Sequence, residues 1–271
     1  MYFFIAIVLV FVFVLITYSQ VRTHTHAYPK WHVEVVSGMS NRIRAIVGLI
    51  YCSRILNRRL VVHWNKSDAC NGLYSELFKS SNLFDLVEVE NSSNPNPYLT
   101  KTNDTSMKII KAYLGDGHKI DFGVLNAIRC EATQPLPWIQ RRIDEFCETY
   151  SIPDRIGLHV RETDLSDKYK SDIGTFENLV QSYDISQGFF IASDNKKRYE
   201  HMISRYDNIV GFSSEDFHDQ GTKRETSLQR ALIDLEILAR CKSIIQTSRS
   251  SFSKLAEKKR ITCNKSFQKP I

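Results

Sequence analysis

Four short segments carry side chains suited to binding an anionic ligand, and the clearest of them is His159-Val160-Arg161. Residues 155–161 have the pattern of a short buried strand that delivers a His and an Arg to its end. In open α/β sheets, ligands bind beyond the carboxyl ends of the strands. A guanidinium is permanently charged and can donate two parallel hydrogen bonds to phosphate oxygens. The segment therefore predicts a phosphate-binding Arg161 with His159 beside it. A strand that merely ends in a surface Arg is the alternative.

Three further turns follow predicted strands and precede predicted helices. They span residues 38–41, 192–195 and 247–252. The first has a Gly that lets backbone approach a ligand, and the last is rich in hydroxyl groups at a helix N-terminus, where N–H donors and the helix dipole favour anions. Helix capping is the alternative explanation for each turn. The candidate ligand-binding residues in these turns are Gly38, Asn41, Asp194, Ser250 and Ser251.

Asp234 is a candidate because of its place on a predicted helix over residues 225–241. It stands at the edge of the apolar stripe of that helix, where a carboxylate is costly unless it is paired or used. Such a carboxylate could accept hydrogen bonds from N1–H and the exocyclic amine of a guanine. The alternative is a boundary residue that faces water.

The elements that must position these residues alternate between strand and helix along the chain. This alternation predicts an α/β fold of parallel sheets covered on both faces. Strands are expected at residues 31–37, 60–64, 107–114, 155–161, 188–193, 208–212 and 243–247. Helices are expected at 42–57, 138–150, 196–206, 225–241 and 250–260, with a surface loop at 91–106. The count fits two small doubly wound, Rossmann-like halves, at 31–150 and 151–271.

The N-terminal segment predicts the compartment. Residues 2–16 are all apolar, which predicts a membrane anchor over residues 1–19 followed by a stem over 20–30. If the segment is instead a cleaved signal peptide, the protein is secreted. We expect a single-pass membrane glycoprotein of the secretory pathway, in the Golgi or the ER, with its catalytic part in the lumen. Sequons that fit this location begin at Asn65, Asn91, Asn103 and Asn264.

Composition and cysteine use are consistent with that expectation. The 271 residues suffice for one large or two small domains, and the net charge of +6 comes from scattered residues. This distribution argues against nucleic-acid binding and favours anionic small molecules. The six cysteines are compatible with disulfides, whose pairing the sequence does not specify. Cys52 and Cys241 lie in apolar helical patterns and are expected to be buried thiols.

The order and spacing of these motifs resemble the GDP-fucose-dependent fucosyltransferases of the nodulation, core α1,6 and protein-O-fucosyl groups. The matching pieces are residues 38–44 with the following helix, His159-Val160-Arg161, residues 191–194, and residues 227–252. The resemblance spans most of residues 33–257. It is strongest from residue 155 onward and weak between 85 and 150.

The resemblance implies a two-domain GT-B architecture, with the acceptor on the N-terminal side and the nucleotide sugar in the C-terminal half. By analogy, Arg161 binds the β-phosphate, His159 and Asp234 bind the guanine, and Ser250 or Ser251 holds the diphosphate. Asn41 then faces the cleft from the other domain. The implied reaction is inverting transfer of fucose from GDP-fucose to a glycan or glycoprotein, without a metal or other cofactor. No Asp-x-Asp triplet is present to hold a divalent ion.

Two departures from the family pattern leave alternatives open. Glu162 stands where the relatives have a second Arg, which weakens the diphosphate clamp and leaves a different nucleotide sugar as an alternative. The missing Arg and the compact acceptor region also leave open a non-catalytic nucleotide- or glycan-binding module. Tyr169 stands where core-type enzymes place a candidate base. The base is therefore unassigned, and the candidate carboxylates are Asp164, Glu162, Asp167 and Asp172.

Overall fold

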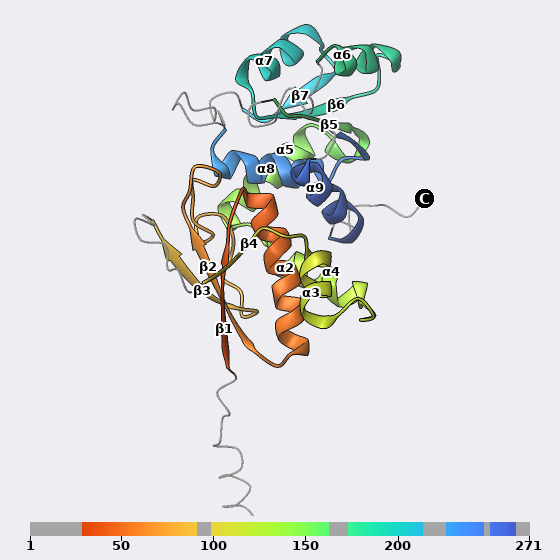
Figure 1. Cartoon of the computed structure of the whole chain (residues 1–271). Helices are drawn as coiled ribbons and strands as arrows, with labels where there is room; N and C mark the ends of the chain where they lie inside the picture. The colour runs from red at the N-terminus through yellow and green to blue at the C-terminus, as the bar shows by residue number, and fades with distance from the viewer. Residues whose placement is uncertain (1–28, 91–98, 163–172, 214–225, 247–249, 264–271) are drawn as a thin grey trace, which may run out of the picture.

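Two parallel four-stranded sheets organise the chain in the computed structural model, which describes residues 29–90, 99–162, 173–213, 226–246 and 250–263 (Figure 1). The first sheet has the order β3-β2-β1-β4 and the second the order β7-β6-β5-β8. The strands are β1 (Lys30–Val35), β2 (Arg59–Asn65), β3 (Asp85–Val89), β4 (Thr100–Thr102), β5 (Ile156–Val160), β6 (Phe189–Ser193), β7 (Ile209–Gly211) and β8 (Ser243–Gln246). The helices are α2 (Met39–Ile55), α3 (Ser106–Leu114), α4 (Phe122–Glu131), α5 (Pro137–Thr149), α6 (Ile173–Ser182), α7 (Lys196–Arg205), α8 (Leu228–Leu238) and α9 (Ser251–Thr262), with a 3-10 turn at Ile152–Asp154. The α/β class and the parallel sheets are confirmed.

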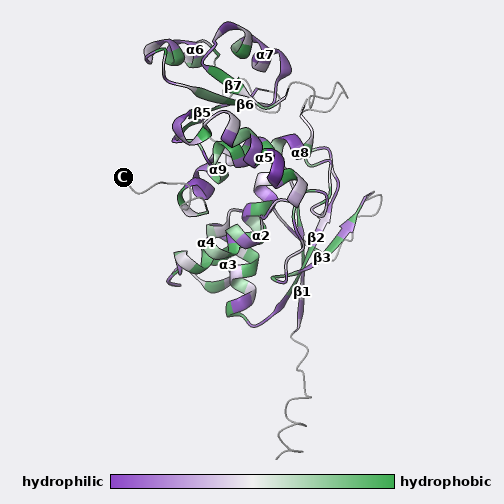
Figure 2. Cartoon of the chain, turned by 180° about the vertical axis from the view of Figure 1, so that it is seen from behind, coloured by the Kyte–Doolittle hydropathy of each residue, from purple (hydrophilic) through white to green (hydrophobic). Residues whose placement is uncertain are grey.

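The second sheet is covered on both faces, as expected for a doubly wound half. Successive side chains of a strand point to opposite faces. Leu158 and Ile191 pack with α6 and α7, whereas Phe190 joins the hydrophobic cluster of α8 and α9. Figure 2 shows hydrophobic residues on strands of this sheet and on the helices next to it. Gly157 permits the close approach of β5 and α8, because a Cβ at this position would lie 2.7 Å from Leu238.

The first sheet differs between its two faces. Its apolar residues, such as Val33 and Val62, pack into the same cluster as α2, α3 and α4, which lie on one side of the sheet (Figure 1). The alternate positions carry polar side chains, including His32, Glu34 and His63. The expected covering by helices is thus found, among the described residues, on one face of this sheet.

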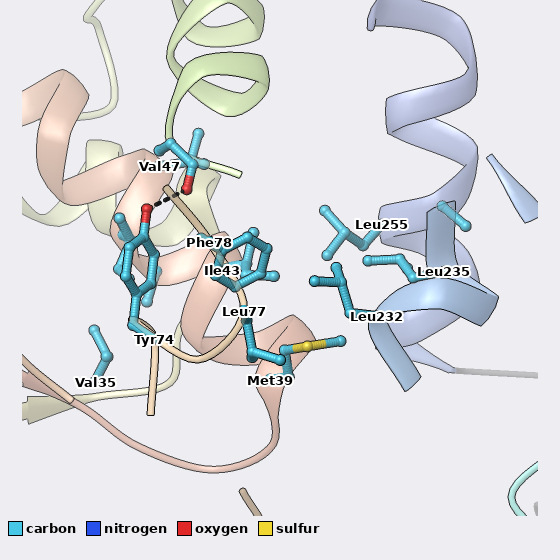
Figure 3. Close-up of a cluster of buried hydrophobic side chains, with 14 of the residues drawn as sticks. Val35, Met39, Ile43, Val47, Tyr74, Leu77, Phe78, Leu232, Leu235 and Leu255 are labelled. Carbon is cyan, nitrogen blue, oxygen red and sulfur yellow. Dashed lines mark hydrogen bonds between the residues drawn. The ribbon is translucent and has the colours of Figure 1, made fainter. Parts of the chain in front are cut away.

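The α8–α9 pair connects the two halves. Leu232 and Leu255 lie opposite Met39 and Leu77 in one continuous cluster of buried side chains (Figure 3). A disulfide between Cys130 and Cys263 joins α4 to the end of α9. Although the two sheets divide between residues 102 and 156, the core is shared, and the domain limits at 31–150 and 151–271 stay a prediction.

Buried polar contacts strengthen the same junction. Lys259 on α9 is 3% exposed; its ammonium pairs with Glu236 at 2.5 Å and donates to the Thr133 hydroxyl at 2.7 Å. Arg240, just after α8, pairs with Asp144 on α5 at 2.6 Å. These contacts fix the helices that lie between the two sheets.

The expected strand over residues 107–114 was wrong, because this segment is helix α3. The two isoleucines favour a strand, but the ends carry helix signals. The Thr105 hydroxyl accepts from the backbone N–H of Lys108 at 3.2 Å, and Gly115 ends the helix with a φ of 86°. Ile109 and Ile110 are buried in the cluster with α2.

Several short elements were not predicted from the sequence. They are β3, α4 and α6, together with β4, which lies inside the predicted loop at 91–106. Within the described ranges, no helix combines the length and hydrophobicity needed to cross a membrane. The expected anchor at residues 1–19 lies outside those ranges.

Candidate functional site

One pocket collects residues from both halves of the chain. Its walls come from the turns after β1, β5 and β6, from the start of α9, and from one face of α8. The residues lining it are Ser37, Gly38, Met39, Ser40, Asn41, Ala69, His159, Arg161, Ala192, Ser193, Asp194, Thr226, Ala231, Asp234, Ser251 and Phe252. Seven of the sequence-predicted candidates therefore meet in one place: Gly38, Asn41, His159, Arg161, Asp194, Asp234 and Ser251.

Sheet topology explains why the pocket forms there. β1 lies between β2 and β4, and β5 lies between β6 and β8. In each sheet the chain first winds to one side of this strand and later returns to its other side. Ligands of open α/β sheets bind at such a switch point, beyond the carboxyl ends of the strands. Both switch points face the same pocket.

His159 and Arg161 occupy the end of β5. His159 is 5% exposed, and its ring stacks on Phe252 with centroids 4.9 Å apart and 24° between the planes. Arg161 follows the strand, is partly exposed and lines the pocket. Arg161 is thus part of the pocket wall, and binding of a phosphate by its guanidinium stays a prediction.

Asp194 fixes the backbone beside Arg161. Its Oδ1 accepts a hydrogen bond from the Glu162 backbone N–H at 2.9 Å, which joins the ends of β5 and β6. The helix cap at this turn is Asn195, whose Oδ1 accepts from the Arg198 N–H at 3.0 Å. Asn195 therefore caps α7, and Asp194 lines the pocket.

Glu162 forms an ion pair with a residue of α7. Its Oε2 lies 3.1 Å from Nε of Arg198 on α7, and Glu162 is not among the residues lining the pocket. The residue that departs from the family pattern is thus held in an ion pair beside the pocket. Its role as a base stays a prediction.

Asp234 is buried, with an exposed fraction of 3%, so the water-facing alternative is wrong. Its Oδ2 accepts from Nε of Arg230 at 2.9 Å, one helical turn earlier on α8. Arg230 is itself buried and lies over the rings of Tyr199 and Phe212. A buried carboxylate needs such a partner, and it presents an anionic acceptor at the pocket wall.

The two candidate serines at the start of α9 have different surroundings. The Ser250 hydroxyl accepts from the Phe252 N–H at 3.2 Å, so this residue caps the helix and is 1% exposed. Ser251 lines the pocket at the helix N-terminus. Of the two, Ser251 is the one placed to meet a ligand.

The turn after β1 presents the N-terminus of α2 to the pocket. Gly38 caps this helix without a side-chain bond and has an ordinary φ of −69°. The left-handed residue in the turn is Ser37, at a φ of 73°. Gly38 lines the pocket, and its approach to a ligand stays a prediction.

The candidate bases Asp164, Asp167 and Asp172 lie outside the described residues, as does Tyr169. So do two sequons, at Asn91 and Asn264.

Asn103 is exposed, whereas Asn65 lies in β2 and donates its amide N–H to Glu34 Oε1 at 3.1 Å. Modification of Asn65 would replace one of the two hydrogens on the nitrogen that makes this bond, and glycosylation stays a prediction. Cys52 and Cys241 are buried thiols, as expected, and burial raises the pKa of Cys52 to about 12. Among the described residues, no cluster of three or more His, Cys, Asp or Glu side chains is arranged to hold a metal ion.

Some pocket residues escaped the sequence reasoning. Ala69 and Thr226 carry no distinctive signal, since neither type marks a site by itself. Outside the pocket wall, the partner of Asp234 was also missed. Arg230 pairs with Asp234, and an Arg four residues before an Asp on a helix is a recognisable ion pair. Arg42, which is buried and donates to the Ser37 carbonyl without lining the pocket, was missed as well.

No protein-family model matches the sequence, and comparison with curated proteins found no match. Solved structures do match. A NodZ α1,6-fucosyltransferase co-crystallised with GDP aligns with a TM-score of 0.57 at 13% identity, over 85% of this chain and 92% of that one. A NodZ from Bradyrhizobium aligns with a TM-score of 0.56 at 13% identity, over 84% and 92% of the two chains. The apo form of POFUT1 aligns with a TM-score of 0.51 at 11% identity, over 87% and 96%.

This chain has the fold of these fucosyltransferases. The alignment covers most of both chains, so the match includes both sheets. The GT-B-like architecture expected from the sequence is thereby supported by structure.

Proposed function

We propose that this protein is a fucosyltransferase that transfers fucose from GDP-fucose, with inversion, to a glycan or glycoprotein acceptor. The observation that carries the proposal is the convergence of Arg161, His159, Asp234 and Asn41 on one pocket between the two sheets. The shared fold adds support, since one of the matching NodZ structures was co-crystallised with GDP and another was soaked with GDP-fucose.

Each residue has a role that fits its surroundings. Arg161 binds the β-phosphate through its guanidinium. Ser251 and the N-terminus of α9 hold the diphosphate, because free N–H groups and the helix dipole favour an anion there. The buried Asp234 accepts from the guanine N–H groups, and His159, held against Phe252, contacts the same base.

Catalysis follows from the charge of the leaving group. Breaking the sugar–phosphate bond leaves negative charge on the nucleotide diphosphate, and donors aimed at that charge stabilise the transition state. Arg161 and the start of α9 are these donors, and they provide positive charge without a metal ion. The acceptor hydroxyl loses its proton to a carboxylate, for which Asp164, Glu162, Asp167 and Asp172 are the candidates.

We further propose that the protein acts in the lumen of the secretory pathway, anchored through residues 1–19. Disulfides persist in oxidising compartments, and the Cys130–Cys263 pair supports this location. If the apolar segment is removed, the same compartment leads to secretion.

A different nucleotide sugar is the second candidate, favoured by Glu162 and its pairing with Arg198. A donor panel distinguishes the two functions. The protein is incubated with GDP-fucose, GDP-mannose and UDP-sugars, and release of nucleotide is measured with and without a mixture of glycan acceptors. We expect turnover with GDP-fucose. Preference for a UDP-sugar would contradict the fucose assignment, and binding without turnover of any donor would indicate a binding module.

Asp234→Asn should weaken GDP binding and reduce the preference for guanine. The side-chain amide of Asn has an NH2 donor in place of one carboxylate oxygen, so it cannot pair with both guanine N–H groups as a carboxylate does. A buried polar group left without a partner costs about 1–3 kcal/mol. Affinities for GDP and ADP are measured by calorimetry. Asp116→Asn is the matched control, because Asp116 is exposed and paired with Lys111 away from the pocket. An unchanged ratio of GDP to ADP affinity in a folded Asp234→Asn protein would contradict the role.

A further inference from the structure

Arg42 is a buried cation in the first turn of α2, with 2% of its surface exposed. Its guanidinium uses three nitrogens at once. Nε donates to the Ser37 carbonyl at 2.8 Å, Nη1 to the Asn65 carbonyl at 2.6 Å, and Nη2 to the Ser67 hydroxyl at 2.9 Å. The plane also lies over the Trp64 ring, 4.9 Å from its centroid. Arg42 therefore ties the ends of β1 and β2 to the start of α2.

The carbonyl that Nε holds belongs to the strained residue of the turn. Ser37 has a φ of 73°, a left-handed conformation that residues with a Cβ rarely adopt. Such a conformation persists only where surrounding contacts impose it. The bond from Arg42 is a direct contact of this kind, made to the backbone of Ser37 itself.

The strained residue in turn holds a pocket residue. The Asn41 amide donates to the Ser37 hydroxyl at 3.1 Å, and Asn41 Oδ1 accepts from Arg44 at 3.4 Å. Ser37, Gly38 and Asn41 all line the pocket, whereas Arg42 does not. A continuous set of contacts therefore leads from Arg42 through Ser37 to Asn41.

We propose that Arg42 is a positioning residue, which holds Ser37 in its left-handed conformation and thereby sets Asn41 and the N-terminus of α2 against the pocket. The proposal rests on the proposed function, because Asn41 then faces the sugar or acceptor from the side opposite the nucleotide-binding residues. The proposed nucleotide-binding residues come from the C-terminal half, from the ends of its strands and from α8 and α9. Loss of Arg42 should therefore lower turnover more than it lowers GDP affinity.

The test compares Arg42→Lys with two double variants. Lys keeps the positive charge but cannot supply the planar set of three donors. We expect kcat to fall about 10- to 100-fold, as for a small misplacement of a pocket group, while the Kd for GDP changes little. Adding Ser37→Gly should restore part of kcat, because Gly accepts a positive φ without support. Adding Ser37→Ala should not, since Ala lacks the same hydroxyl but keeps the Cβ.

Amide hydrogen exchange gives a readout that does not depend on activity. In Arg42→Lys we expect faster exchange at residues 38–41 and unchanged exchange in β5. If Arg42→Lys does not fold, Ser67→Ala removes one of the three contacts and should act in the same direction with a smaller effect. Wild-type kcat and exchange in Arg42→Lys, or equal kcat in the Gly and Ala double variants, would overturn the proposal. Absence of GDP binding by the wild-type protein would overturn the proposed function, while the exchange result still tests Arg42.

Discussion

Arg161→Ala should lower the rate of fucose transfer by about 100- to 1,000-fold, because one preorganised donor to a developing anion contributes about 3–4 kcal/mol. Arg161 is the cation at the end of β5 that lines the pocket. Since it is partly exposed and lies beyond the strand, its loss should leave the fold intact. Initial rates at saturating and limiting GDP-fucose separate the effect on kcat from that on KM.

The control for this prediction is Arg205→Ala. Arg205 is an exposed Arg on α7 that pairs with Glu177 at 3.5 Å and lies outside the pocket. Its removal changes the net charge equally and should leave the rate unchanged. A folded Arg161→Ala protein with the wild-type kcat/KM would contradict the role of Arg161.

Removing the Cys130–Cys263 disulfide should lower the free energy of unfolding more than any of the other substitutions proposed here. Cys130 and Cys263 are 133 residues apart in the sequence. A cross-link closing a loop of this length lowers the entropy of the unfolded chain, which corresponds to about 5 kcal/mol in the chain-entropy account. The double variant Cys130→Ser/Cys263→Ser should therefore unfold at a clearly lower denaturant concentration.

Reducing agent provides the matched comparison. It should lower the unfolding midpoint of the wild-type protein to that of the double Ser variant, and it should not affect the double variant itself. Cys52 and Cys241 are buried thiols and do not contribute to this response. An unchanged wild-type midpoint on reduction would show that the cross-link does not stabilise the junction of α4 and α9.

Much of the second sheet could be predicted because its strands are short apolar runs between polar turns. The strand expected at 188–193 is observed as Phe189–Ser193, and the helix expected at 196–206 as Lys196–Arg205. The strand predicted for residues 107–114 was wrong. Two adjacent isoleucines favour a strand locally, but packing against α2 and the Thr105 cap stabilise a helix. Tertiary contacts overrode local preference there.

The candidate site could be predicted in part for a related reason. The carboxyl ends of parallel strands meet at one edge, so the turns after β5 and β6 had to lie close together. The approach of the turn after β1 depends on α8 and α9 packing between the halves, which is a long-range contact without a local signal. The strain at Ser37 was also beyond sequence reasoning, because Gly38 beside it is the residue type that usually adopts such a conformation.

The central claim is that the pocket binds guanosine diphosphate, and thermal unfolding of the full chain with GDP, UDP, ADP and CMP tests it most directly. A ligand at 100 times its Kd stabilises the folded state by about 2.7 kcal/mol, which raises the unfolding midpoint measurably. We predict a rise with GDP, smaller or absent with the other nucleotides, and lost in Arg161→Ala. A rise with UDP in place of GDP, or no rise with any nucleotide at saturating concentration, would contradict the claim.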